Sequence, residues 1–202
     1  SCSLVRSNKL SQAEVERAVS VLRQKGCDFM VHAPGVDTHC FRYWQGGAAE
    51  NADFRGRLAR YERFGEPLDQ LPVEASQVVV IHPNAGGVEL WRQLRDDLAP
   101  LHVVRTTSPL DGKSVWIEIF PRGVSKASAC AWVADQHSVP HSETLAIGND
   151  YNDLDMLDWA ATKFVVGNAP DELRGRYPVV ASHRNSGVSE GVRLWQNARN
   201  VK

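Results

Sequence analysis

Four side chains that carry oxygen donors lie close together in residues 144–157, TLAIGNDYNDLDML. A short apolar run ends at Gly148, and the donors follow it directly. They belong to Asn149, Asp150, Asn152 and Asp153. Carboxylates and amides at the C-terminal end of a buried strand are the ligands that a hard cation such as Mg²⁺ requires. A polar turn with an N-cap explains two such residues more easily than four. The stretch therefore predicts a metal or phosphate site.

A basic side chain precedes this stretch at a second candidate position. Ser125 is expected to be the N-cap of a helix whose first turn holds Lys126. A helix N-terminus favours anions, and an ammonium group there adds a mobile positive charge for a phosphate. A Lys at a helix start is usually only exposed. However, loops at the carboxyl ends of parallel strands share one crevice, so we expect Lys126 to approach residues 148–153.

The composition is typical of a globular protein and excludes several functional classes. The 202 residues are 43% hydrophobic and 23% charged, with a formal net charge of −1. This balance gives no reason to expect nucleic acid or an anionic membrane as a partner. No apolar run approaches the roughly 20 residues that span a bilayer, and the first ten residues, SCSLVRSNKL, do not form the h-region of a secretory signal. The cysteines fit no zinc or disulfide pattern, which favours a reducing, cytoplasmic location. They are Cys2, Cys27, Cys40 and Cys130.

Residues 1–121 are expected to form an α+β domain. Ser11 and Glu14 predict a capping box for a helix over 11–25. The runs CDFMVHA and HCFRYW predict a hairpin, and a second helix is expected over 49–64. Its four arginines could bind phosphate, but the neutral overall charge favours a solvated face. The order strand, helix, strand, strand over 77–120 predicts a mixed or antiparallel sheet backed by helices.

From residue 122 the pattern becomes an alternation of helices and strands. Strands are expected at 144–148, 163–168 and 177–182, each followed by a helical segment. That alternation is typical of a parallel, doubly wound sheet. An open parallel sheet usually has more than three strands, so residues 122–202 look like part of a domain. The predicted fold class is α/β, with an α+β domain followed by part of a Rossmann-like core.

Two segments of the second half resemble motifs of the haloacid dehalogenase-like (HAD) hydrolases, in particular the Cof-like branch with a large α/β cap of the C2 type. GVSK, residues 123–126, resembles the third motif, in which a Lys stands at a helix start. GNDYND, residues 148–153, resembles the fourth motif, G-D-x-x-N-D, and Met156 and Leu157 follow as in the family. The resemblance implies that residues 1–121 are the cap and residues 122–202 the C-terminal part of the core.

The chain departs from the family pattern in two respects. The first acidic position of the fourth motif is Asn149 here, with Asp150 directly after it, and which of them binds the metal stays open. The D-x-D-G-T segment with the nucleophile, and the second Ser/Thr motif, do not occur in this sequence. Asp37 in GVDTH is the nearest candidate and lacks the second Asp. We therefore expect a C-terminal piece of a protein of about 270 residues, inactive and poorly stable alone, with an exposed apolar sheet edge.

The resemblance implies a Mg²⁺-dependent phosphatase that acts through an aspartyl-phosphate. It implies that Asn149, Asp150 and Asp153 bind or support the metal. It also implies that Asn152 binds the substrate, and that Lys126 is a catalytic residue that binds the phosphate and stabilises the phosphoryl charge. The implied substrate is a small phosphorylated metabolite, a sugar phosphate or a similar small phosphoester.

Four side chains of the first hairpin are candidate specificity residues of the cap, although such residues more often lie on a solvated sheet face. They are His32, His39, Arg42 and Trp44. Two other functions stay open. One is a binding or regulatory module that kept the fold without the nucleophile. The other is a different phosphoryl-transfer enzyme, such as a mutase or a phosphonatase-like lyase. The sequence does not indicate the oligomeric state.

Overall fold

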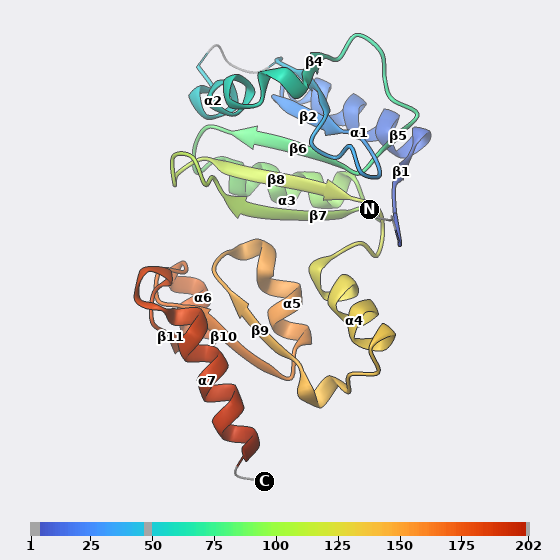
Figure 1. The fold of residues 1–202 in the computed structure, drawn as a ribbon. Coiled ribbons are helices and arrows are strands. Elements are labelled where there is room, and N and C mark those ends of the chain that lie inside the picture. Colours follow the sequence, from blue (N-terminus) through green and yellow to red (C-terminus); the bar gives the residue numbers. More distant parts are fainter. Residues whose placement is uncertain (1–4, 47–49, 201–202) are drawn as a thin grey trace. The chain divides into compact units, whose positions relative to one another are not determined.

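The chain has a mixed α/β fold, which the computed structural model describes for residues 5–46 and 50–200 (Figure 1). Cys2 and the first residue of the helix expected over 49–64 lie outside this range. The chain divides into two compact units, Ser1–Val124 and Ser125–Lys202. Among the described residues, no helix is long and apolar enough to cross a membrane.

A six-stranded sheet forms the centre of the first unit, in the order β4-β3-β2-β6-β8-β7. All neighbouring strands are antiparallel except β3 and β4, so the sheet is mixed, as expected. The strands are β2 (Phe29–His32), β3 (Phe41–Trp44), β4 (Gly65–Pro67), β6 (Gln77–His82), β7 (His102–Thr107) and β8 (Val115–Phe120). The predicted hairpin is confirmed as β2 and β3.

A separate antiparallel pair joins β1 (Leu10–Ser11) to β5 (Glu74–Ala75). The sequence over 66–76, which contains Pro67 and Pro72, predicts a connector, yet β4 begins just before this segment and β5 lies within it. Both strands are short and are held by backbone pairing with distant strands, which leaves no alternation of side chains for a sequence pattern to detect.

Helices cover both faces of the large sheet (Figure 1). On one face α1 (Gln12–Gln24) and α3 (Gly87–Asp97) pack against a core that includes Phe29 and Val31. On the other face α2 (Ala52–Arg60) inserts Phe54 into a second core. The 3-10 turn η1 (Glu62–Phe64) follows α2. The expected capping box of α1 is confirmed: the backbone N–H of Ser11 donates to the Glu14 carboxylate at 2.8 Å.

One arginine of α2 departs from the solvated face that the sequence predicted. The Arg57 guanidinium carbon lies 4.6 Å from the centroid of the Trp116 ring. Its Nε atom is buried and has no hydrogen-bond partner in the described part of the chain. Burial lowers the pKa of Arg57. The solvated-face prediction is therefore wrong for Arg57, because the aromatic ring draws this side chain onto the sheet, whereas Arg55 and Arg60 are exposed.

The second unit contains a three-stranded parallel sheet, in the order β11-β10-β9. Its strands are β9 (Leu145–Gly148), β10 (Thr162–Val166) and β11 (Val179–Val180), which confirms the three predicted parallel strands. Its helices are α4 (Lys126–Gln136), α5 (Leu154–Trp159), α6 (Asp171–Arg176) and α7 (Gly187–Asn200). Three 3-10 turns accompany them: η2 (His141–Glu143), η3 (Tyr151–Asp153) and η4 (His183–Asn185). A small core lies under α5 and α6 and includes Leu157, Val165 and Leu173.

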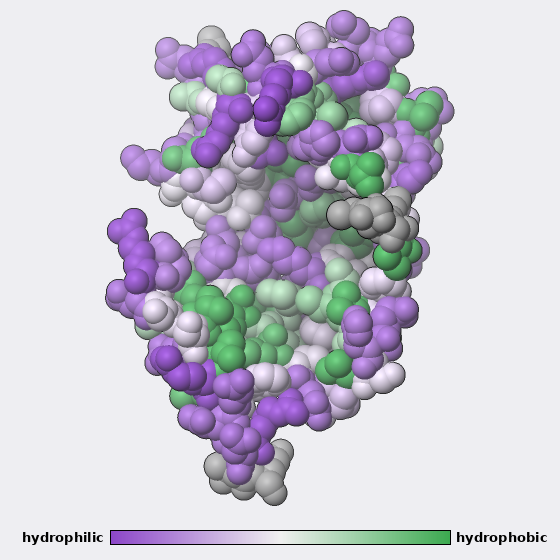
Figure 2. All heavy atoms as spheres, in the orientation of Figure 1, coloured by the Kyte–Doolittle hydropathy of each residue, from purple (hydrophilic) through white to green (hydrophobic). Residues whose placement is uncertain are grey.

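The second unit has an open sheet edge and an apolar surface beside it. Within the described residues β9 pairs only with β10. Helix α4 has no buried residue, and its Val133 is 49% exposed. An open groove of about 460 Å³ separates α4 from the start of β9, and Val133, Val139 and Leu145 line it. Figure 2 shows apolar side chains gathered over this unit. The exposed apolar edge expected from the sequence is thus present.

Candidate active site

The candidate site is built on the turn that follows β9. This turn starts at Gly148, the buried last residue of the strand. A Cβ atom on residue 148 would lie 2.9 Å from Cβ of Asp153 and 2.9 Å from Cδ1 of Leu157. Those distances are shorter than van der Waals contact, so a larger residue would push the turn away from the strand. Glycine at this position lets η3 and α5 fold back onto the end of β9.

Asp150 shapes the turn through its backbone contacts. It is the N-cap of η3, and its Oδ1 atom accepts a hydrogen bond from the Tyr151 N–H at 2.7 Å. The side chain is buried, and Asp150 and Asp153 form a reciprocal capping box. Capping an orphan N–H group is the usual role of an Asp at a helix start. The Asp150 carboxylate is therefore engaged in holding the turn.

Asp153 joins the turn to the lysine of α4. It is only 5% exposed, and its Oδ2 atom accepts hydrogen bonds from the N–H groups of Asn149 at 2.8 Å and Asp150 at 3.3 Å. Its Oδ1 atom lies 2.5 Å from Nζ of Lys126. A buried carboxylate requires such partners, because an unpaired charge away from water is strongly unfavourable. The structure thus brings Lys126 to residues 148–153, as the sequence predicted.

Lys126 is presented by a well-capped helix start. Ser125 Oγ accepts a hydrogen bond from the Ser128 N–H at 3.1 Å, as expected for an N-cap. The Lys126 side chain is 46% exposed, so its ammonium rests on a buried carboxylate on one side and remains accessible to an anion on the other. Such a fixed cation can bind a phosphate oxygen.

Two amides of the turn are available to a ligand. Asn149 is exposed and Asn152 is half-buried. Across residues 5–46 and 50–200, the side chain of neither residue makes a hydrogen bond to the protein. An amide offers one oxygen acceptor and two N–H donors, so it suits either a cation or a phosphate. These side chains therefore complement Lys126 at the same end of β9.

The donor chemistry of the turn suits Mg²⁺ but provides only part of a coordination shell. The described residues contain no group of three or more His, Cys, Asp or Glu side chains that could hold a metal ion. Asp150 is engaged in capping, and Asp153 is engaged by Lys126 and the backbone. The side-chain oxygens of Asn149 and Asn152 are the donors of the turn that make no hydrogen bond within the described residues, and a hard cation held there would take its remaining oxygen ligands from water, substrate or another segment.

Asp155 is a residue of this site that the sequence did not reveal. Its Oδ2 atom accepts a hydrogen bond from the Ala127 N–H at 3.1 Å, and its Oδ1 atom accepts one from the Met156 N–H at 2.8 Å. The first contact joins the start of α5 to the start of α4, across 28 residues of sequence. This contact depends on how the starts of the two helices pack together, which the sequence does not indicate.

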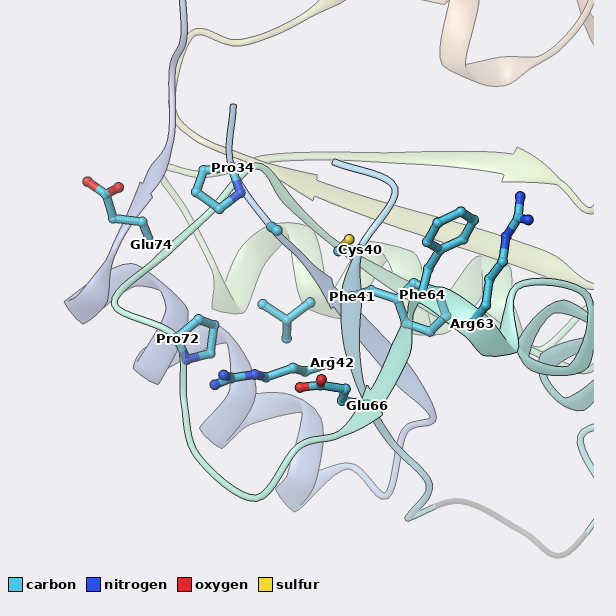
Figure 3. Close-up of a pocket in the computed structure, with 11 residues that line it drawn as sticks. Pro34, Cys40, Phe41, Arg42, Arg63, Phe64, Glu66, Pro72 and Glu74 are labelled. Atoms are coloured by element: carbon cyan, nitrogen blue, oxygen red, sulfur yellow. The ribbon is translucent and has the colours of Figure 1, made fainter. Parts of the chain in front are cut away.

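The four candidate specificity residues lie in different places in the first unit. Arg42 and His32 point to opposite faces of the sheet, because Arg42 pairs with Val31, the neighbour of His32. Arg42 lines a pocket of about 330 Å³ next to its register partner Glu66 (Figure 3) and donates to the Gln70 carbonyl at 2.8 Å. It is the only one of the four, all of which are described, that lines this pocket.

The other three candidates have structural contacts. His32 is 4% exposed, its Nδ1 atom lies 2.8 Å from the Thr38 carbonyl oxygen, and burial lowers its pKa to about 4. His39 packs edge-on against Phe64, with the ring centroids 4.6 Å apart. Trp44 lies under a guanidinium group at 4.2 Å. The structure therefore does not bring the four candidates together into one site.

Asp37, the nearest candidate for a nucleophile, lies exposed in the turn between β2 and β3. Its carbonyl oxygen accepts a hydrogen bond from the Cys40 N–H at 2.8 Å. No second Asp follows it at the spacing of the D-x-D-G-T motif. The surroundings of Asp37 are those of a hairpin turn.

The chain matches a known protein family. The family model described as haloacid dehalogenase-like hydrolase matches residues 2–192. A Haemophilus influenzae protein named "Putative phosphatase" is 33% identical over 149 residues, which is 71% of this chain and 55% of that protein. The HMP-PP phosphatase of Citrobacter koseri is 32% identical over 82 residues, 39% of this chain and 30% of the relative. This chain thus spans about half of the length of the first relative and less of the second.

Solved structures share the fold. A sugar phosphatase of HAD subclass IIB has a TM-score of 0.70 at 15% identity, over 94% of this chain and 68% of the other. A Streptococcus mutans protein has a TM-score of 0.72 at 15% identity, over 96% of this chain and 70% of the other. The resemblance that residues 123–126 and 148–153 indicated is confirmed. The chain belongs to the haloacid dehalogenase-like hydrolase family.

Proposed function

We propose that this chain carries the lysine and metal-binding half of the active site of a phosphatase that hydrolyses small phosphorylated metabolites. The observation that carries the proposal is the Lys126–Asp153 pair, held 2.5 Å apart at the C-terminal end of β9. A fixed, partly exposed ammonium beside two amides is suited to bind a phosphoryl group.

Each side chain of the site has a task in this reaction. Lys126 binds a phosphoryl oxygen and stabilises the charge that develops there in the transition state. Asp153 keeps the ammonium in place and holds the turn through its backbone contacts. Asn152 donates an amide hydrogen bond to the substrate. Asn149 would hold Mg²⁺, which when bound neutralises charge on the phosphate.

The nucleophile of the proposed reaction belongs to a D-x-D-G-T segment that this sequence does not contain. In the proposed mechanism its carboxylate attacks the phosphorus, the ester oxygen leaves, and water then hydrolyses the aspartyl-phosphate. In this proposal a further strand pairs with β9 and places the carboxylate beside Lys126. The open edge of β9 and the apolar groove beside α4 are the observations that favour it.

The substrate class rests on similarity in names as well as on chemistry. One similar structure is a sugar phosphatase, and one similar sequence is an HMP-PP phosphatase. Their named substrates differ, and what they share is a small phosphorylated molecule. Within that class, a sugar phosphate is our first expectation.

A binding module without catalysis is the second candidate. It is favoured by Asn149, which places a neutral amide where the family motif has a carboxylate, and therefore weakens the charge available to a metal. Such a module would bind a phosphoester at Lys126 and release no phosphate.

The test uses an extended protein, which we define as this chain joined to a segment that supplies a strand with the D-x-D-G-T motif and the second Ser/Thr motif. We expect it to release inorganic phosphate from at least one member of a panel of sugar phosphates and nucleotides when Mg²⁺ is added. We expect the 202-residue chain to release none. Binding without release would favour the module, and transfer of the phosphate to a second sugar would favour a mutase. No release from any substrate would refute the phosphatase proposal.

A further inference from the structure

We propose that Asp155 is a positioning residue that fixes the Lys126 ammonium on Asp153 by binding the backbone of the following residue, Ala127. Its consequence for catalysis rests on the proposed function, whereas its consequence for the structure does not.

The start of α4 has no buried residue to anchor it, so polar contacts there matter for its position. Helix α4 has no buried residue, and Val133 on it is exposed. Lys126 is the first residue of this helix and carries a long, flexible side chain. A displacement of the helix start would move the ammonium away from the phosphoryl position, and small displacements are costly for a group that must be pre-organised.

Two contacts hold the helix start to the turn after β9. Lys126 Nζ meets Asp153 Oδ1 at 2.5 Å, and the N–H of Ala127 donates to Asp155 Oδ2 at 3.1 Å. The two donors are neighbours in the chain, and the two carboxylates are two residues apart. One contact alone would let the helix pivot about it. The second contact, made by rigid backbone, fixes the direction from which the lysine side chain leaves.

The Asp155 carboxylate is itself held in place for this contact. Its other oxygen accepts the Met156 N–H at 2.8 Å. A carboxylate at the N-terminus of α4 also satisfies an amide that the helix leaves without a partner and interacts favourably with the helix dipole. The Ala127 N–H, which a phosphate could otherwise have approached, is therefore occupied, and the phosphate-binding task at this helix start falls to the Lys126 side chain.

We call the pair of contacts Lys126–Asp153 and Ala127–Asp155 the clamp. Two structural measurements test it in the 202-residue chain. For Asp155→Ala we expect acetic anhydride to label Lys126 several-fold faster, relative to Lys163 in the same molecule, and the Ala127 amide to exchange faster with solvent. Asp155→Asn keeps an oxygen acceptor and should stay close to the parent. The matched control is Asp171→Asn, a first-turn carboxylate of α6 that pairs locally with Arg174, and it should change neither readout.

A kinetic cycle in the extended protein tests the link to Lys126. We expect Asp155→Ala to lower kcat about tenfold, as loss of a supporting contact does at other sites, and Asp171→Asn to leave it unchanged. In a variant that already carries Lys126→Ala, the same Asp155→Ala change should not lower kcat further. A full additional loss in that variant would mean that Asp155 acts on stability alone and would overturn the inference.

The two arms separate failure of the clamp from failure of the proposed function. Faster labelling of Lys126 without hydrolysis by the extended protein would support the clamp and refute the phosphatase. Unchanged labelling and exchange in Asp155→Ala would overturn the clamp, whatever the activity.

Discussion

The Lys126 ammonium lies 2.5 Å from a carboxylate oxygen of Asp153, a side chain whose other oxygen accepts two backbone N–H groups of the turn after β9. One buried carboxylate therefore fixes both the cation and the loop that faces it. The proposed catalytic lysine and the proposed metal-binding turn are in this way a single structural element, and changes to either should be felt by the other.

Replacing Asp153 should destabilise the second unit. Asp153→Ala leaves the N–H groups of Asn149 and Asp150 without their acceptor and Lys126 without its counter-ion. Because the Asp153 carboxylate is buried, we expect a loss of about 2–4 kcal/mol in the free energy of unfolding. Amide hydrogen exchange of β9 measures it, and Asp153→Asn, which keeps one acceptor, should lose less. Unchanged protection of β9 in Asp153→Ala would contradict this account of the turn.

Gly148 should tolerate no side chain. A methyl group there would meet Asp153 and Leu157 at 2.9 Å, so Gly148→Ala should lower stability by about 1–3 kcal/mol through overpacking. It should also separate Lys126 from Asp153. Gly175→Ala is the matched control, since nothing lies within 4 Å of the added atom, and better helix propensity should keep it neutral or stabilising. Thermal melts of the two variants compare them, and equal melting temperatures would rule out the tight turn.

His32 should make the first unit sensitive to acid. Burial lowers its pKa from 6.5 to about 4, with Arg57 adding to the effect and the Thr38 carbonyl opposing it. The folded state thus favours the neutral ring, so this contribution is complete above pH 6.5 and is lost as the pH falls toward 4. The shift corresponds to roughly 3 kcal/mol.

The free energy of unfolding in urea is measured at several pH values between about pH 7 and pH 4. Protection of the β2 amides from hydrogen exchange reports on the first unit. We expect His32→Phe to flatten the pH dependence over this interval. If the variant loses as much stability on acidification as the parent does, His32 is not the group responsible.

Asn149 should limit the affinity for Mg²⁺. Asn149→Asp restores a carboxylate at the position where the family motif has one, and the added charge should tighten Mg²⁺ binding about tenfold. Calorimetric titration of the extended protein measures it. Asn185→Asp, an exposed position in η4, adds the same charge elsewhere in the unit and should have little effect. Equal gains in the two variants would show a general charge effect and argue against a ligand at Asn149.

Local sequence signals predicted much of this structure. The capping residues Ser11 and Ser125, the β2–β3 hairpin and the three parallel strands were all readable, because each depends on neighbouring residues and on side-chain periodicity. The rule that loops at the carboxyl ends of parallel strands share one crevice also predicted that Lys126 would approach residues 148–153. The roles within the fourth motif were not separable, since capping by Asp150 and pairing by Asp153 depend on the direction of each side chain.

Contacts between distant residues could not be predicted in the same way. The Asp155–Ala127 hydrogen bond, the pairing of β1 with β5 and the packing of Arg57 on Trp116 each join segments far apart in sequence. None of them leaves a periodic pattern, and each depends on how helices and strands pack after they form. For the same reason the four hairpin candidates, which are close in sequence, do not form one site: His32 lies on the sheet face opposite Arg42 and Trp44, and His39 lies in the turn between the strands.

The most direct test of the central claim compares kcat for phosphate release between the extended protein and its Lys126→Ala variant. If Lys126 stabilises the phosphoryl charge, the variant should lose about 10²–10³ in kcat. Lys163→Ala, which removes a lysine of β10 from the same unit, should retain the parent's rate. A Lys126→Ala variant that hydrolyses phosphoesters as fast as the parent would contradict the claim that this chain supplies the catalytic cation.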